Sequence, residues 1–185
     1  MGSKRKAVID ALIEMMDTMS LDDIRAEDLI KRSGVSKTTF YRLFHDKYDV
    51  MNSAYLDAST AVVHKDPDMK NMRLWTIEDC NHIAKNPRFY QKILSYHGQN
   101  SFRDTIKAYY YQNIQRHVEM KANGHILTDQ EQYAICVYSE IAAFAMIWWI
   151  ADGCQRSPEQ LENYQEDCIP QCLRRYFDLE ESSNP

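Results

Sequence analysis

The sequence predicts an all-α protein of nine helices. Apolar residues recur at spacings of three and four along most of the 185 residues, and no apolar–polar alternation is long enough to indicate a strand. The breaks between these segments are rich in Gly, Asn, Ser, Thr and Pro, the residues that end and start helices. We expect a three-helix module over residues 1–47 and a six-helix domain over residues 48–185.

The first expected helix lies within residues 1–20. Its apolar residues fall on one side, whereas Asp10, Glu14 and Asp17 interrupt the run that an export signal would need. The chain has five cysteines, an odd number in a domain large enough to fold without disulfides, so we expect reduced thiols and a cytoplasmic location.

Residues 29–44 predict two short helices joined by a glycine turn. Gly34 suits the left-handed conformation that ends a helix, and Ser36 offers a hydroxyl cap to the next one. Val35, Phe40 and Phe44 then form one apolar stripe. The opposite face carries side chains that bond to phosphates and base edges, as in a helix-turn-helix that binds DNA. These side chains are Ser36, Lys37, Thr38, Thr39, Tyr41 and Arg42.

The pattern Gly-Val-Ser-x-x-Thr-Phe-Tyr-x-x-Phe-x-x-Lys over residues 34–47 resembles the DNA-binding domain of the TetR (tetracycline repressor) family, with a match over about residues 7–55. The resemblance implies a TetR-like fold in which the six side chains above face the operator and Lys47 contacts a phosphate. Arg25 stands where the family commonly has Thr or Ser; it cannot cap a helix but can reach a phosphate. The Trp-Trp-Ile segment at residues 148–150, with Ser157-Pro158-Glu159, weakly resembles the C-terminal domain of one branch of the family.

Charge is unevenly distributed along the chain. Residues 1–47 contain nine Lys or Arg and eight Asp or Glu, so the remaining 138 residues contain 13 and 19. A net charge of −5 argues against a protein that coats nucleic acid without selection. The basic Lys4-Arg5-Lys6 leader fits either a solvated terminus or an arm that contacts phosphate.

The larger domain is expected to contain six helices with recognisable ends. Pro87 suits the first turn of one helix, and Asn123-Gly124 ends another. Thr128 and Glu131 form a capping box, and Ser157-Pro158 starts the last helix, which Pro170 should kink or interrupt. The expected ranges are 46–63, 71–85, 87–96, 101–122, 128–151 and 157–178.

The helix ending at Ala151 is apolar around nearly its whole circumference. Glu140 lies near its centre and would be costly in a bilayer, so we expect a helix buried in protein and no membrane partner. Both sides of this helix have to be covered, which favours a homodimer in which this helix and the last one of each chain form the contact. The alternative is a core helix of a single chain. The expected interface residues are Tyr138, Ala142, Ala145, Met146, Trp149, Ile169, Leu173 and Tyr176.

The middle helices are rich in aromatic residues and Met, which often line pockets for small apolar ligands, although such stripes are more often plain core. The candidate lining residues are Trp75, Tyr90, His97, Tyr110, Tyr111, Phe144 and Trp148.

No catalytic motif is present in the sequence, and we expect no enzyme activity and no cofactor. Cys168 and Cys172 lie four residues apart but lack the two further ligands of a zinc site, so no metal is expected.

Together these features predict a homodimeric repressor that binds a palindromic double-stranded DNA operator and is released by a small apolar or aromatic effector. The alternative is a regulator or coactivator of the same fold that a protein partner controls.

Overall fold

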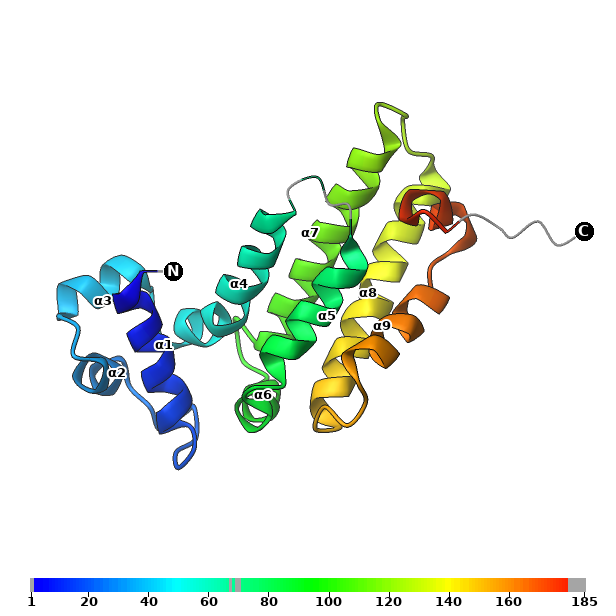
Figure 1. The fold of residues 1–185 in the computed structure, drawn as a ribbon. Helices are drawn as coiled ribbons and strands as arrows, with labels where there is room; N and C mark the ends of the chain where they lie inside the picture. The colour runs from blue at the N-terminus through cyan, green and yellow to red at the C-terminus, as the bar shows by residue number, and fades with distance from the viewer. Residues whose placement is uncertain (1, 67, 69–70, 180–185) are drawn as a thin grey trace, which may run out of the picture.

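The computed structural model describes residues 2–66, 68 and 71–179. Within these residues the chain forms nine α-helices and one 3-10 helix and no strand, so the all-α prediction is confirmed (Figure 1). The helices are α1 (Ser3–Met15), α2 (Ala26–Ser33), α3 (Lys37–Leu43), α4 (Lys47–Lys65), α5 (Met72–Ile83), α6 (Pro87–Leu94), α7 (Phe102–Ala122), α8 (Asp129–Ala151), α9 (Pro158–Asp167) and the 3-10 helix η1 (Gln171–Phe177).

Helices α1 to α3 form a small module at one end of the molecule, and α4 leads from it into the larger domain (Figure 1). Leu12, Ile24, Leu29 and Phe40 are completely buried at its centre. Because α1 packs against both α2 and α4, the module has a core of its own that continues along α4.

The helix ends follow the signals in the sequence. Gly34 has a φ of 68°, the left-handed conformation, and it separates α2 from α3. Asn123 ends α7 with a φ of 47°. Thr128 and Glu131 form the expected capping box at the start of α8, and Pro158 occupies the first turn of α9. These ends are therefore local properties of the sequence.

The last expected helix is two elements. Helix α9 ends at Asp167, and after Pro170 the chain resumes as the 3-10 helix η1. Proline has no N–H to donate to the preceding turn and its ring clashes there, so Pro170 interrupts the helix instead of kinking it.

The larger domain is a layered bundle in which α7 and α8 pack along each other, with α5 and α9 side by side against them (Figure 1). Its core includes Phe102, Met146, Trp149 and Ile150, each at most 1% exposed. Among the described helices, α8 is long and apolar enough to span a membrane, but 56% of its most apolar window is buried inside the protein.

Candidate nucleic-acid interface

The outer face of α3 is polar because its inner face is fully used in packing. Phe40 and Phe44 are at most 2% exposed, and the centres of their rings lie 5.8 Å apart on the buried side of the helix. Tyr41 is 47% exposed, with its ring edge-on to Phe40. The structure leaves Ser36, Lys37, Thr38, Tyr41 and Arg42 exposed and Thr39 half-buried on this face.

Ser36 caps α3, as the sequence indicates. Its hydroxyl oxygen accepts a hydrogen bond from the Thr39 backbone N–H at 3.2 Å and its hydroxyl donates to Thr39 Oγ1 at 3.0 Å. The cap fixes the direction in which α3 starts, and it places the first backbone N–H groups and Lys37 at the exposed end of the helix.

Arg25 occupies the N-cap position of α2 without a side-chain cap. Its backbone N–H instead donates to Asp28 Oδ2 at 2.9 Å, so Asp28 supplies the reciprocal half of a capping box. The Arg25 side chain is exposed at the module surface and is free to contact a phosphate, as proposed from the sequence.

Lys47, which the family resemblance places at a phosphate, is hydrogen-bonded inside the module in this structure. Its ammonium group donates to three backbone carbonyls in the segment between α1 and α2: Leu21 at 2.7 Å, Asp22 at 3.1 Å and Ile24 at 2.9 Å. An ammonium group has three donors. All three are used inside the protein, so the structure gives Lys47 a role in holding this segment and does not present it to a phosphate.

Arg5 is likewise fixed inside the fold, which argues against a basic N-terminal arm that includes it. Its guanidinium pairs with Asp57 at 2.6 Å and donates to the Leu43 carbonyl at 2.8 Å and to Ser53 Oγ at 2.7 Å. It also lies 4.5 Å from the centre of the Phe44 ring. The hydrogen bond to Asp57 raises the pKa of Arg5. Arg5 thus joins α1, the end of α3 and α4.

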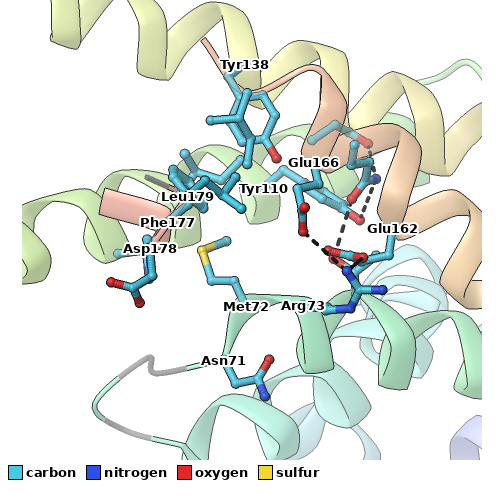
Figure 2. Close-up of a pocket in the computed structure, with 16 residues that line it drawn as sticks. Asn71, Met72, Arg73, Tyr110, Tyr138, Glu162, Glu166, Phe177, Asp178 and Leu179 are labelled. Atoms are coloured by element: carbon cyan, nitrogen blue, oxygen red, sulfur yellow. Dashed lines mark hydrogen bonds and ion pairs between the residues drawn. The ribbon is translucent and has the colours of Figure 1, made fainter. Parts of the chain in front are cut away.

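A cavity of about 320 Å³ lies in the larger domain between α5, α7, α8, α9 and the segment after η1 (Figure 2). Of the seven expected lining residues, Tyr110 lines this cavity and Trp75 lines a smaller one beside it. Tyr90 is buried against α4, where its hydroxyl lies 3.2 Å from the Ala54 carbonyl, and His97 lines an open groove between α1 and α6. The expectation for these two residues is not supported.

The other three expected lining residues lie on the surface. Tyr111 is 40%, Phe144 66% and Trp148 43% exposed. Phe144 and Trp148 therefore lie on the exposed side of α8. A helix whose whole circumference is apolar gives no sign in the sequence of which side is inside.

The expected dimer residues lie mainly inside the protomer. Tyr138, Ala142, Met146 and Trp149 are at most 5% exposed and face the core of their own protomer. The other expected interface residues, Ala145, Ile169, Leu173 and Tyr176, are half-buried or buried. The large apolar side chains exposed on α8 are Tyr133, Val137, Ile141, Phe144 and Trp148, which are spaced by three and four and therefore lie on one face.

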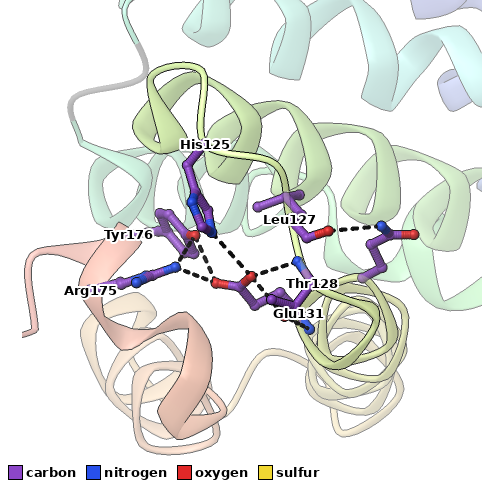
Figure 3. Close-up of polar contacts among 7 residues, drawn as sticks. His125, Leu127, Thr128, Glu131, Arg175 and Tyr176 are labelled. Atoms are coloured by element: carbon purple, nitrogen blue, oxygen red, sulfur yellow. Dashed lines mark hydrogen bonds and ion pairs between the residues drawn. The ribbon is translucent and has the colours of Figure 1, made fainter.

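The larger domain contains buried polar groups that were not among the residues expected from the sequence. Glu131, which is 4% exposed, accepts hydrogen bonds from Tyr176 at 2.7 Å and Arg175 at 2.6 Å, which tie η1 to the start of α8 (Figure 3). Burial raises the pKa of Glu131, but the bonds from Thr128, Tyr176 and Arg175 outweigh it and lower the pKa to about 2. Asp79 lies four residues from both Trp75 and Ile83 and is buried on the same side of α5. This spacing is visible in the sequence and could have indicated that Asp79 is buried.

Comparison with models of protein families shows to which family the chain belongs. A family model of TetR regulators, described as "Transcriptional regulator C-terminal region", matches residues 70–169. This region is more than half of the chain, which therefore belongs to the TetR family of transcriptional regulators. No curated protein sequence matches it.

Two solved structures share the fold. "Dihydroxyacetone kinase operon activator DhaS" is 14% identical, with a TM-score of 0.69, and the alignment covers 90% of this chain and 93% of that one. A putative TetR-family transcriptional regulator from Syntrophomonas wolfei str. Goettingen is 15% identical, with a TM-score of 0.51, covering 88% and 90%. At these identities the likeness concerns the fold alone.

Proposed function

We propose that this TetR-family protein is a homodimeric, cytoplasmic repressor whose two α3 helices bind a palindromic operator and whose affinity for DNA falls when a small molecule binds the larger domain. The observation that carries the proposal is the exposed polar and basic face of α3, backed by the buried Phe40 and Phe44. Lys37 and Arg42 supply charge for phosphates, and Tyr41 and Thr38 supply hydrogen bonds at the base edges.

The proposed dimer uses the exposed stripe of α8. Its five residues, Tyr133, Val137, Ile141, Phe144 and Trp148, extend along α8 over about 22 Å at about 1.5 Å per residue. A continuous apolar stripe of this length is unusual on a monomer and suits a self-complementary contact. A second copy is the favoured occupant because a palindrome presents the same half-site twice, one turn of DNA apart, to two copies of α3.

Two contacts join the larger domain to the DNA-binding module and form the proposed route to α3. Lys92 of α6 donates to the Met16 carbonyl and, at 3.2 Å, to the Asp17 carbonyl, both at the end of α1. Tyr96, just after α6, stacks on Tyr48 of α4 with 4.8 Å between ring centres. A ligand that shifts α5 or α6 would therefore act on α1 and α4, which carry the DNA-binding module.

The experiment has two parts. Sedimentation of the full chain should show a dimer, and selection from random duplex DNA should recover a palindrome that binds with a strong salt dependence. Lys37→Ala, Tyr41→Ala and Arg42→Ala should each weaken binding to the selected duplex. A monomer in solution, or unchanged affinity in all three variants, would overturn the proposal.

Activation is the second candidate, because a solved structure with this fold is named an operon activator. It requires the same α3 contacts, with or without a partner protein on the larger domain. A reporter gene behind the selected operator separates the two: expression that falls when the protein is supplied supports repression, and expression that rises supports activation.

A further inference from the structure

Helix α5 places a carboxyl group deep inside the larger domain. Asp79 is 3% exposed, and the Tyr55 hydroxyl of α4 donates to its Oδ2 at 3.0 Å. Burial raises the pKa of Asp79 to about 7, although Ser59 and Tyr55 partly offset it. No described Lys, Arg or His pairs with this carboxyl group, whereas buried carboxylates in proteins are usually paired with a cation.

Four buried polar atoms around Asp79 make no hydrogen bond of standard geometry among the described residues, although Ser59 and Tyr109 lie close enough to Asp79 to lower its pKa. They are Asp79 Oδ1, Ser59 Oγ, Trp75 Nε1 and the Tyr109 hydroxyl. Unpaired buried groups are rare, and each normally indicates a missing partner. The titratable groups that act on Asp79, or on which it acts, are Tyr55, Glu78, Cys80, Tyr90, Tyr109 and Tyr110, none of which supplies a positive charge.

Asp79, Trp75 and Tyr109 line a small cavity of about 20 Å³, which has room for one small polar group. Met72, Thr76, Tyr110 and Ile114 line both this inner cavity and the outer cavity of about 320 Å³. Figure 2 shows Met72 and Tyr110 projecting into the outer cavity. The four shared residues place the two cavities side by side.

The surroundings favour a positive charge. Glu162, Glu166 and Asp178 line the outer cavity, and Arg73 there is already paired with Glu162 at 2.8 Å and Glu166 at 3.3 Å. At the inner end, the Tyr109 ring lies edge-on to Tyr55 at 5.2 Å and to Tyr110 at 6.1 Å. Aromatic rings beside one carboxylate form a common environment for an ammonium group.

We propose that the larger domain binds a small organic amine, with its ammonium group against Asp79 Oδ1 in the inner cavity and its apolar body in the outer cavity. This inference rests on the proposed function, in which an effector binds this domain. The ammonium group supplies the missing cation and donates to Asp79, Ser59 and the Tyr109 oxygen. A neutral alcohol satisfies the hydrogen bonds and leaves the charge of Asp79 unpaired, so it should bind more weakly.

Calorimetric titration of the full chain without DNA at pH 8, above the pKa of Asp79, tests the inference. The probes are benzylamine against benzyl alcohol and benzoate, and hexylamine against hexan-1-ol. We expect the better amine to bind about 10- to 100-fold more tightly than its alcohol. The Asp79→Asn variant should bind amines more weakly by a similar factor and bind alcohols with unchanged affinity. Glu78→Gln removes an equal charge from the exposed neighbouring residue and should leave binding within about twofold.

Thermal unfolding of Asp79→Asn shows whether this variant folds, and Tyr109→Phe provides a second variant that should weaken amine binding with the carboxyl group intact. Equal binding of amine and alcohol, no binding of either amine, or unchanged amine affinity in folded Asp79→Asn would overturn the inference. The proposed function is measured separately with the selected DNA duplex. Amine binding that leaves DNA affinity unchanged refutes effector release and keeps the site, whereas a DNA-binding dimer that binds no amine refutes the site alone.

Discussion

Replacing Lys47 with Met distinguishes a structural role from a DNA contact. The change keeps an unbranched side chain and removes the ammonium group that bonds to the carbonyls of Leu21, Asp22 and Ile24 at 2.7, 3.1 and 2.9 Å. A hydrogen bond to a charged group contributes about 1.5–3 kcal/mol. Because Lys47 is half-buried and water can replace part of the network, we expect a total loss of about 1.5–3 kcal/mol rather than three times that value.

The assay is denaturant unfolding at fixed protein concentration, since a dimer's midpoint depends on concentration. Binding to the selected duplex is measured in parallel over a range of salt. Lys37→Met on the exposed face of α3 is the matched control: stability should be unchanged, and the salt slope should fall by about one unit. If Lys47→Met keeps full stability and lowers the slope by one unit, Lys47 is a phosphate contact and the structural assignment is refuted.

Four further predictions concern other parts of the molecule. The pKa of Glu131 falls from an ordinary value of 4.5 to about 2 in the folded protein, so its stabilising effect is present above about pH 4.5 and is lost as the pH falls towards 2. In thermal unfolding, the Glu131→Gln variant should therefore be less stable than the wild type at pH 7 and equally stable near pH 2. Phe144→Glu places a charge on the exposed stripe of α8 and should convert the dimer to monomers in sedimentation, while a persisting dimer would exclude this face. Arg42→Ala, if Arg42 contacts a base, should relax specificity at one operator position by about 1–3 kcal/mol in a repeated DNA selection. Lys92→Met removes the hydrogen bonds from α6 to the end of α1. It should reduce the effect of an amine on DNA affinity and leave the amine affinity measured by calorimetry unaltered. If the amine changes DNA affinity as much as in the wild type, coupling through Lys92 is excluded.

Much of the DNA-binding module could be predicted because its signals are local. Gly34 ends α2, Ser36 caps α3, and the spacing of Phe40 and Phe44 fixes which side of α3 is buried. Each of these features depends on residues within one or two helical turns.

The roles of Lys47 and Arg5 could not be predicted in this way. Lys47 bonds to carbonyls 23 to 26 residues earlier, and Arg5 pairs with Asp57, 52 residues later. A long cationic side chain near a helix-turn-helix has the same sequence signature whether it contacts phosphate or the protein's own backbone. Their roles depend on which acceptors the fold brings near them.

The helical class, the ends of most helices and the exposed face of α3 follow from local sequence patterns, because helix periodicity and capping act over a few residues. The packing of distant segments sets which side of α8 is interior, where the cavities lie and that Asp79 is buried away from every described Lys, Arg and His. A helix with apolar residues around nearly its whole circumference can pack through any face. Its neighbours, which are distant in the sequence, select the face that is covered and leave the stripe from Tyr133 to Trp148 exposed.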